Sequence, residues 1–227
     1  MTTTPDLIDL LAANLTPVRR LRPPIARAAT WLVLAAVIVA LLAITQGLRS
    51  DIATCLRQSS FVMSLGGALL TGVLATIAAF MLSLPDRSRL WIVLPAPSLV
   101  FWLATVGYQC LTGWISVQPG GISLGEAARC FATLVLTGLP LSLALLLMLR
   151  HAAPLRPTPV ILAGSLAVAA ITAVALSLFH SGDATIMILM WNLGTANLFV
   201  GLGSLFGETM FSWVTPRTDL RATRRSA

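Results

Sequence analysis

The chain has no lysine, eight acidic residues and two histidines among its 227 residues, so it offers few side chains for acid–base or nucleophilic catalysis. In the topology deduced below, His151 and His180 fall on opposite sides of the membrane and cannot share a site. The sequence also lacks a nucleophile elbow, a phosphate-binding loop, a zinc-binding HExxH pattern and a dinucleotide-binding glycine pattern. These absences predict that the protein is not an enzyme.

Cysteine is scarce as well, because Cys55, Cys110 and Cys130 are the only three. Three cysteines without CxxC spacing are too few for a disulfide framework and predict neither a metal site nor a cofactor. In a six-span arrangement all three fall at or near the outer face, where thiols can oxidise if that face is a periplasm.

The residues that are abundant are apolar: 57% of the chain is hydrophobic and 10% is charged. Six stretches have the length of about 20 residues that a helix needs to cross a hydrocarbon core about 30 Å thick. They cover residues 28–48, 61–84, 90–111, 130–149, 160–178 and 184–213. The first is too long for a signal peptide and lacks a small-residue cleavage site. The sequence therefore predicts an all-α polytopic membrane protein with six transmembrane helices.

Arginine placement sets the predicted orientation. Twelve of the fifteen arginines lie on alternate connections, namely Arg19, Arg20, Arg22, Arg27, Arg87, Arg89, Arg150, Arg156, Arg217, Arg221, Arg224 and Arg225. Because positively charged loops stay in the cytoplasm, both termini are expected to be cytoplasmic, in a bacterial inner membrane. The net charge of +7 is then explained by topology and anionic headgroups, so we expect the bilayer, and not nucleic acid, to contact these residues.

Three regions follow from this topology. Residues 1–27 form a cytoplasmic amphipathic segment for partner binding, residues 28–214 a six-helix membrane domain, and residues 215–227 a basic cytoplasmic tail. Trp31 is expected at the inner interface. The four arginines between residues 19 and 27 are expected to moor the segment to the inner leaflet.

The N-terminal segment carries the clearest binding pattern. Thr4, Pro5 and Asp6 suit a helix start, and Pro17 ends the helix near residue 16. An apolar stripe with helical spacing is formed by Leu7, Ile8, Leu11 and Leu15. The stripe can lie on headgroups or enter a groove of a partner protein; the first turns carry acidic and no basic residues, which favours the partner.

Inside the membrane, the prolines Pro95, Pro97 and Pro140 are expected to kink their helices. No acidic or basic residue lies at the middle of a span, and Glu208, about one turn from the inner end of the last segment, comes closest. A transporter usually carries intramembrane charge, so this absence counts against a transport role. A small transporter or lipid-interacting protein is the alternative hypothesis. It predicts that residues 1–16 are dispensable and that Glu208 or Asn192 is critical.

The outer face offers a redox hypothesis. Cys110 ends the third segment and Cys130 begins the fourth, so a disulfide is geometrically possible if their α-carbons come within about 7 Å. His180 and Asp183 bracket the next outer turn, and a histidine there can lower the pKa of a nearby thiol. Alternatively, both cysteines are small apolar residues at helix ends. A membrane-embedded redox enzyme is a third reading, which requires turnover of a thiol or quinone pair.

Six pieces of this sequence, in order, resemble the negative regulators of sigma F, membrane anti-sigma factors of proteobacteria long treated as a domain of unknown function. The first piece is Asp6-Leu7-Ile8, Leu11, the run from Pro17 to Pro24, Arg27 and Trp31. The others are Leu70-Thr71-Gly72; Pro85-Asp86-Arg87-Ser88-Arg89 with Trp91; Gly107-Tyr108-Gln109-Cys110-Leu111 with Trp114; Ala153-Pro154-Leu155-Arg156-Pro157; and Phe179-His180-Ser181-Gly182-Asp183-Ala184 with Trp191.

The resemblance implies six helices and a cytoplasmic segment that holds an extracytoplasmic-function sigma factor until an outside signal, oxidative or metal stress in family members, releases it. The holding role would pass to Asp6, Leu7, Ile8, Leu11, Pro17 and Val18, and the sensing role to Cys130 with Cys110. Some members have a cysteine directly after the histidine that matches His180, where this chain has Ser181. A disulfide between those two loops is therefore impossible here: either Cys110 replaces the missing partner or sensing takes another route.

Overall fold

The computed structural model describes residues 22–113, 124–149 and 157–179, with the isolated residues 4, 12 and 13. Side chains are described in the same ranges except at residues 109–113, 124–130 and 157. Every element in these ranges is helical. The elements are α2 (Pro24–Gln46), α3 (Ile52–Cys55), α4 (Ser59–Leu82), the 3-10 helix η1 (Arg89–Val93), α5 (Ala96–Gly113), α6 (Leu124–Leu149) and α7 (Pro157–Phe179).

Five of the described segments are long and apolar enough to cross a membrane. They are Pro24–Gln46, Ser59–Leu82, Arg89–Tyr108, Phe131–Leu149 and Thr158–Phe179. Each overlaps one of the first five apolar stretches of the sequence, so within the described ranges the prediction of an all-α fold with helices long and apolar enough to span a membrane is confirmed. Residues 184–213 lie outside the described ranges, and the number of six spans and the sidedness of the termini stay predictions.

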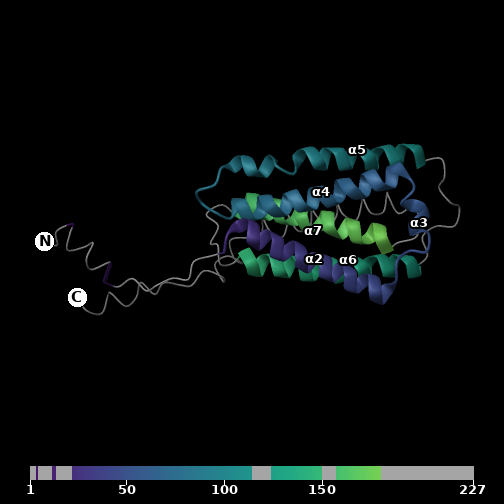
Figure 1. The fold of residues 1–227 in the computed structure, drawn as a ribbon, viewed down its shortest axis with the longest axis horizontal. Coiled ribbons are helices and arrows are strands. Elements are labelled where there is room, and N and C mark those ends of the chain that lie inside the picture. The colour runs from purple at the N-terminus through teal and green to yellow at the C-terminus, as the bar shows by residue number, and fades with distance from the viewer. Residues whose placement is uncertain (1–3, 5–11, 14–21, 114–123, 150–156, 180–227) are drawn as a thin grey trace.

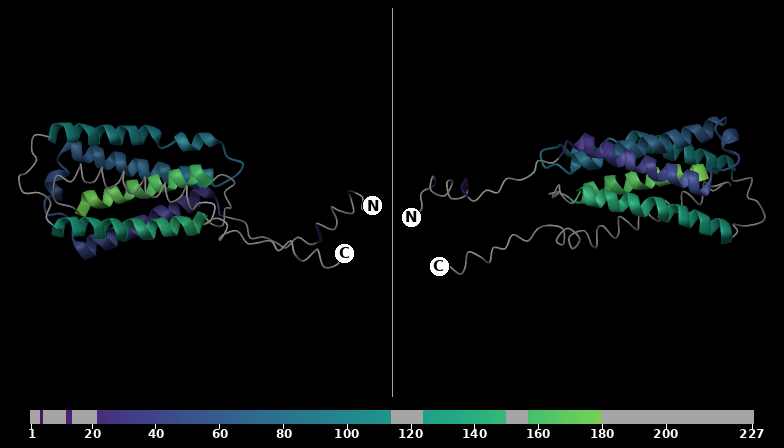
Figure 2. Two further views of the ribbon diagram at one scale, coloured as in Figure 1. Left: turned by 180° about the vertical axis from the view of Figure 1, so that it is seen from behind. Right: turned by 60° about the horizontal axis from the view of Figure 1, so that its bottom comes forward.

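The helices form an elongated bundle with α4 and α7 at its centre (Figure 1). Helix α5 packs on α4 at one side, α6 packs on α7 at the other, and α2 lies across α4 and α6. The two further views agree with this order (Figure 2). We call the end where α2 begins and α4 and α6 finish the proximal end, and the end that carries α3 the distal end.

Small residues allow the central pair to approach closely. A β-carbon added at Gly72 of α4 would lie 2.8 Å from Ile171 Cδ1 of α7. Ala75, Ala78 and Ala79 on α4 are fully buried. Because lipid tails are as apolar as the helices, close van der Waals contact between small residues is what holds such helices together.

Three buried threonine hydroxyl groups in this core bond to their own helices. Thr71 donates to the Gly67 carbonyl at 2.7 Å, Thr76 to the Gly72 carbonyl at 2.7 Å, and Thr137 to the Thr133 carbonyl at 2.6 Å. Each bond spans four residues, which satisfies the hydroxyl without a partner helix. These threonines therefore fill space between helices without exposing an unpaired polar group to lipid.

Helix ends follow local sequence signals. Pro24 occupies the first position of α2, where its missing N–H and fixed φ cost nothing, so the helix begins four residues before the predicted span. Gly47 ends α2 with φ 76°, in the left-handed region that favours glycine. The region limits at residues 27 and 214 stay predictions.

The three prolines behave differently from one another. Pro95 falls between η1 and α5, so the third span is interrupted there rather than bent. Pro97 is the second residue of α5, where proline fits the first helical turn and causes no kink. Pro140 lies inside α6, which continues through it. Of the three prolines, Pro140 is thus the one that lies in the interior of a helix, and the kink expected there stays a prediction.

Candidate sites at the two ends of the bundle

The seven residues predicted to hold a partner lie outside the described residues. They are Asp6, Leu7, Ile8, Leu11, Leu15, Pro17 and Val18. The continuous part of the described chain begins at Arg22, just after the last of these seven residues, and enters α2 two residues later. The structure therefore shows how the attachment point of the segment is fixed to the bundle.

Arg27 fixes the first turn of α2 to two other helices. Its guanidinium donates a hydrogen bond to the main-chain carbonyl of Met148, in the last turn of α6. The same group lies 5.1 Å from the centre of the Phe80 ring of α4. Only 6% of Arg27 is exposed. A last-turn carbonyl has no helical donor, and a cation is favourable at a helix C-terminus, so Arg27 caps α6 from outside it.

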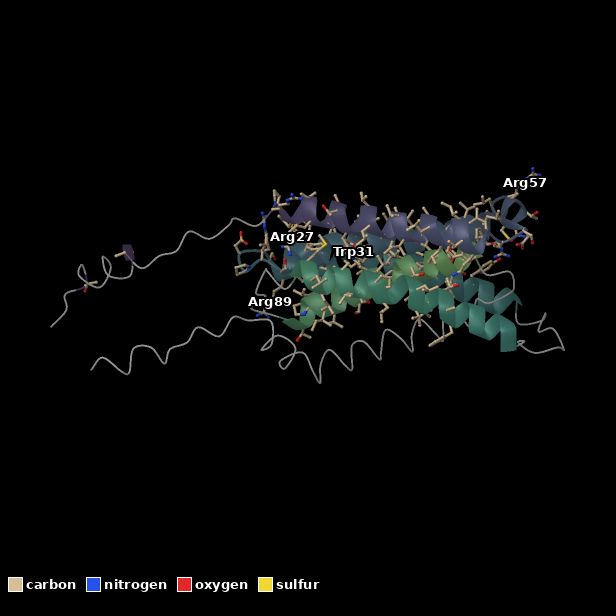
Figure 3. All side chains as sticks on the ribbon, turned by 90° about the horizontal axis from the view of Figure 1, so that it is seen from below. Arg27, Trp31, Arg57 and Arg89 are labelled. Carbon is tan, nitrogen blue, oxygen red and sulfur yellow. The ribbon has the colours of Figure 1, made fainter. Side chains whose placement is uncertain are left out.

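Trp31, one turn further along α2, makes the second fixed contact. Its indole Nε1 donates to the carbonyl of Leu141 on α6 at 3.1 Å, and the residue is fully buried. Figure 3 shows Arg27 and Trp31 close together near the proximal end, on the same side as Arg89, with Arg57 at the opposite end.

One of these two positions differs from the sequence-based expectations. Arg27 was expected to moor the chain to lipid headgroups, but it is buried against α6. Trp31 faces α6 as well, and its place at the membrane interface stays a prediction. Their spacing of four residues places them on one helical face, and this is the signal that could have paired them. The sequence does not show that this face points inward, because α2 is apolar on all sides.

A polar cluster occupies the distal end. Arg49 donates to Asp51 through Nε at 2.7 Å and through a terminal nitrogen at 2.6 Å, and its main-chain N–H donates to the Leu178 carbonyl at 3.1 Å. The Cys55 thiol donates to the same Asp51 carboxylate at 3.5 Å. The main-chain bond thus ties the loop between α2 and α4 to the end of α7, and the bidentate pair fixes the loop internally.

The cluster shifts both titratable groups. The hydrogen bonds from Arg49 hold the pKa of Asp51 well below its ordinary value. Burial raises the pKa of the Cys55 thiol, and the neighbouring Asp51 raises it further. Because the thiolate is the reactive form, a raised pKa makes the free Cys55 thiol less reactive than an ordinary thiol, although the charge of Arg49 partly offsets the shift.

Asp51→Asn is expected to increase the rate at which a maleimide labels Cys55 about tenfold, because the thiol loses the negative charge that raises its pKa and α3 loses its tie to Arg49. The rate is measured by mass spectrometry on purified protein that carries Cys110→Ser and Cys130→Ser. Since the pKa of Asp51 is depressed, the pair stays charged below the ordinary carboxyl value of about 3.9 and is lost only as pH falls through the lowered value. Labelling between about pH 6 and pH 8 therefore compares a charged Asp51 with a neutral amide.

The matched control is Arg57→Gln, which changes charge in the same loop without touching the pair. It should label at the wild-type rate. Equal labelling of Asp51→Asn and wild type would contradict the contact between Asp51 and the thiol.

The predicted sensing residues are placed only in part. Cys110 belongs to the last turns of α5 and Cys130 to the first turns of α6, and their side chains are not described. Helix α5 packs on α4, and α6 packs on α7 and α2 (Figure 1). A Cys110–Cys130 bond would thus join helices on different sides of the central pair, and it stays a prediction. His180 and Asp183 lie outside the described residues.

Among the described residues, no three His, Cys, Asp or Glu side chains converge as metal ligands. The chemistry visible at the two ends is hydrogen bonding and charge pairing between helices. Such contacts hold a helix bundle in one arrangement.

Comparison with known proteins gives one family. The family model described as negative regulator of sigma F matches residues 11–213, which covers part of the N-terminal segment and all the described helices. No curated protein and no solved structure matches the chain. On the strength of this match over most of its length, the chain belongs to the family of negative regulators of sigma F.

Proposed function

We propose that this protein is a multi-pass anti-sigma factor of the bacterial inner membrane, which holds an extracytoplasmic-function sigma factor through residues 1–27 and releases it when a stress signal reaches the outer face. The observation that carries the proposal is the family match, which starts at residue 11, within the N-terminal segment, and runs on through the apolar helices. The match takes in residues 11–27 together with the apolar helices, which supports a regulator whose partner-binding segment is tethered to the membrane.

The proposed orientation places the proximal end in the cytoplasm. The proximal end of the described chain carries four arginines, Arg22, Arg27, Arg87 and Arg89, against one acidic residue, Asp86, whereas the loop between α2 and α4 at the distal end carries Arg49 and Arg57 against Asp51. The excess of positive charge favours retention of the proximal end in the cytoplasm. The N-terminal segment, which leads into α2 at this end, is then on the side where a sigma factor is found.

The proposed contact surface consists of the leucine-rich stripe with Asp6, Pro17 and Val18. A helix this short is marginal alone and gains most of its order when its apolar face enters a groove. We propose sensing at Cys110 and Cys130, with His180 and Asp183 as neighbours. Induction by oxidants that persists when both cysteines are replaced by serine would contradict this assignment.

The central test is co-purification. The full chain in detergent is mixed in turn with each purified extracytoplasmic-function sigma factor of the same organism, and one of them is expected to be retained. A chain lacking residues 1–16 should lose that sigma factor, because it lacks the stripe, whereas residues 1–27 fused to a soluble carrier should retain it. If the full chain retains none, or if removal of residues 1–16 changes nothing, the proposed function is wrong.

A further inference from the structure

Two side chains on one face of α2 bond to α6 at carbonyls seven residues apart. Arg27 donates to the carbonyl of Met148, and Trp31 donates to that of Leu141 at 3.1 Å. The helices run in opposite directions, so the earlier residue of α2 meets the later residue of α6. We call this pair of contacts the Arg27–Trp31 latch (Figure 3).

The latch depends strongly on how α2 and α6 are placed. Arg27 is 6% exposed and Trp31 is fully buried, so neither donor can turn to water. Both ion pairs among the described residues, Arg49 with Asp51 and Arg87 with Asp86, involve other arginines. A buried cation is costly unless it is hydrogen-bonded. If α6 shifts relative to α2, Arg27 loses the Met148 carbonyl, and its buried charge keeps only the Phe80 ring of α4 as a partner among the contacts described.

The backbone hydrogen bonding of α6 is interrupted by a proline next to the latch. Pro140 directly precedes Leu141, the acceptor for Trp31. Proline has no N–H, so the carbonyl four residues before it loses its helical donor, and helices bend at such positions. The helix reaches from the distal end, where it contains Cys130, to the proximal end, where Arg27 caps it.

Helix α2 continues directly into the N-terminal segment. Arg27 is the fourth residue of α2, and its main-chain N–H bonds to the Pro23 carbonyl at 3.1 Å, in the first turn. The stiff Pro23–Pro24 pair allows little freedom between this turn and the residues before it. The position of the first turn of α2 therefore sets where the segment leaves the bundle.

We propose that the Arg27–Trp31 latch couples α6 to the N-terminal segment: the closed latch maintains the partner-holding state, and movement of α6 opens it. The inference rests on the proposed function, because it regulates the same segment. In this proposal the latch contacts belong to the partner-holding state alone, so removing one of them shifts the balance toward the releasing state without any signal.

The test uses Arg27→Met, which keeps an unbranched apolar stem but removes the guanidinium donors, and Trp31→Phe, which removes the indole N–H. Deuterium uptake is measured in the purified full-length chain for peptides covering residues 24–31 of α2 and 141–149 of α6. Transcription from a promoter of the retained sigma factor is measured in unstressed cells, at equal membrane levels of each variant. Both variants are expected to take up more deuterium in both peptides and to raise transcription about tenfold.

Two further variants separate coupling from general damage. Thr30→Ala removes a hydrogen bond of 2.8 Å that Thr30 makes to Ala26 within the same turns of α2, on the exposed side. It should leave both readouts unchanged. Arg27→Lys keeps a charged donor and should restore most of the repression that Arg27→Met loses, which a folding defect would not allow.

Failure of the latch and failure of the proposed function give different results. Residues 1–27 on a soluble carrier have no α6, so in that setting Arg27→Met should bind the sigma factor as well as the unaltered segment does. Weaker binding there would make Arg27 a direct contact and overturn the latch. The latch is also overturned if uptake in residues 141–149 stays at the wild-type level, or if uptake rises while transcription stays repressed. If neither the unaltered segment nor the full chain binds a sigma factor, the proposed function itself is wrong, and the latch, which rests on it, falls with it.

Discussion

A chain with Leu7→Asp and Leu11→Asp is expected to bind its sigma factor at least about a hundredfold more weakly than the wild type, because two charges would replace the apolar anchors of a helix that enters a groove. The two residues are four apart and share one face of the predicted helix. Affinity is measured with the full chain in detergent. In cells, transcription from the promoter of the released sigma factor should become independent of stress.

Single substitutions provide a matched comparison. Leu11→Asp and Ala13→Asp each add one carboxylate to the same helix, but position 13 lies about 200° round the helix from position 11. Ala13 is exposed in the structure. Only Leu11→Asp should weaken binding. Equal loss of affinity for both would show that net charge matters and the stripe does not, and full affinity of the double variant would remove the stripe as the contact.

The substitution Gly72→Leu is expected to have the largest effect on stability, with a thermal midpoint lower by roughly 5–10 °C. Even a β-carbon at this position would lie 2.8 Å from Ile171 Cδ1 and 3.5 Å from the Ala170 β-carbon. The isobutyl group would therefore force α4 and α7, the central pair of the bundle, apart. The midpoint is followed as the fraction of monomeric protein that survives heating in detergent.

Gly66→Leu is the control for this experiment, because it is the same substitution in the same helix. A β-carbon at Gly66 would have no neighbour within 4 Å, and the residue is exposed. The replacement should leave the midpoint unchanged or slightly raised, since leucine favours helix more than glycine does. A midpoint for Gly72→Leu as high as that for Gly66→Leu would contradict the close contact of α4 with α7.

Much of the fold was predictable because the membrane makes length and hydrophobicity decisive. Backbone groups in lipid must be satisfied within the segment, so a long apolar stretch becomes a helix almost regardless of its detailed sequence. The interruption at Pro95 was expected as a kink, but η1 ends before it and α5 starts after it. A proline with a second proline two residues later favours the start of a new helix over a bend in one.

The candidate sites were less predictable, for two different reasons. The Asp51–Cys55 contact is local, since its residues are four apart. It requires the short helix α3, which lies outside the six apolar stretches that the sequence predicts as helices. The Arg27–Met148 contact joins residues 121 apart in the sequence. Local spacing does not indicate which helix of a bundle lies next to which.

The sequence alone determined the helical class, the positions of the first five apolar spans, the bias of arginine toward alternate connections and the resemblance to negative regulators of sigma F. All of these depend on local composition and order along the chain. The tertiary structure decided that Arg27 and Trp31 face α6, that Gly72 meets α7, and that α5 and α6 pack on different helices. Apolar helices look alike on every side in sequence, so only the packing of the bundle selects which faces meet.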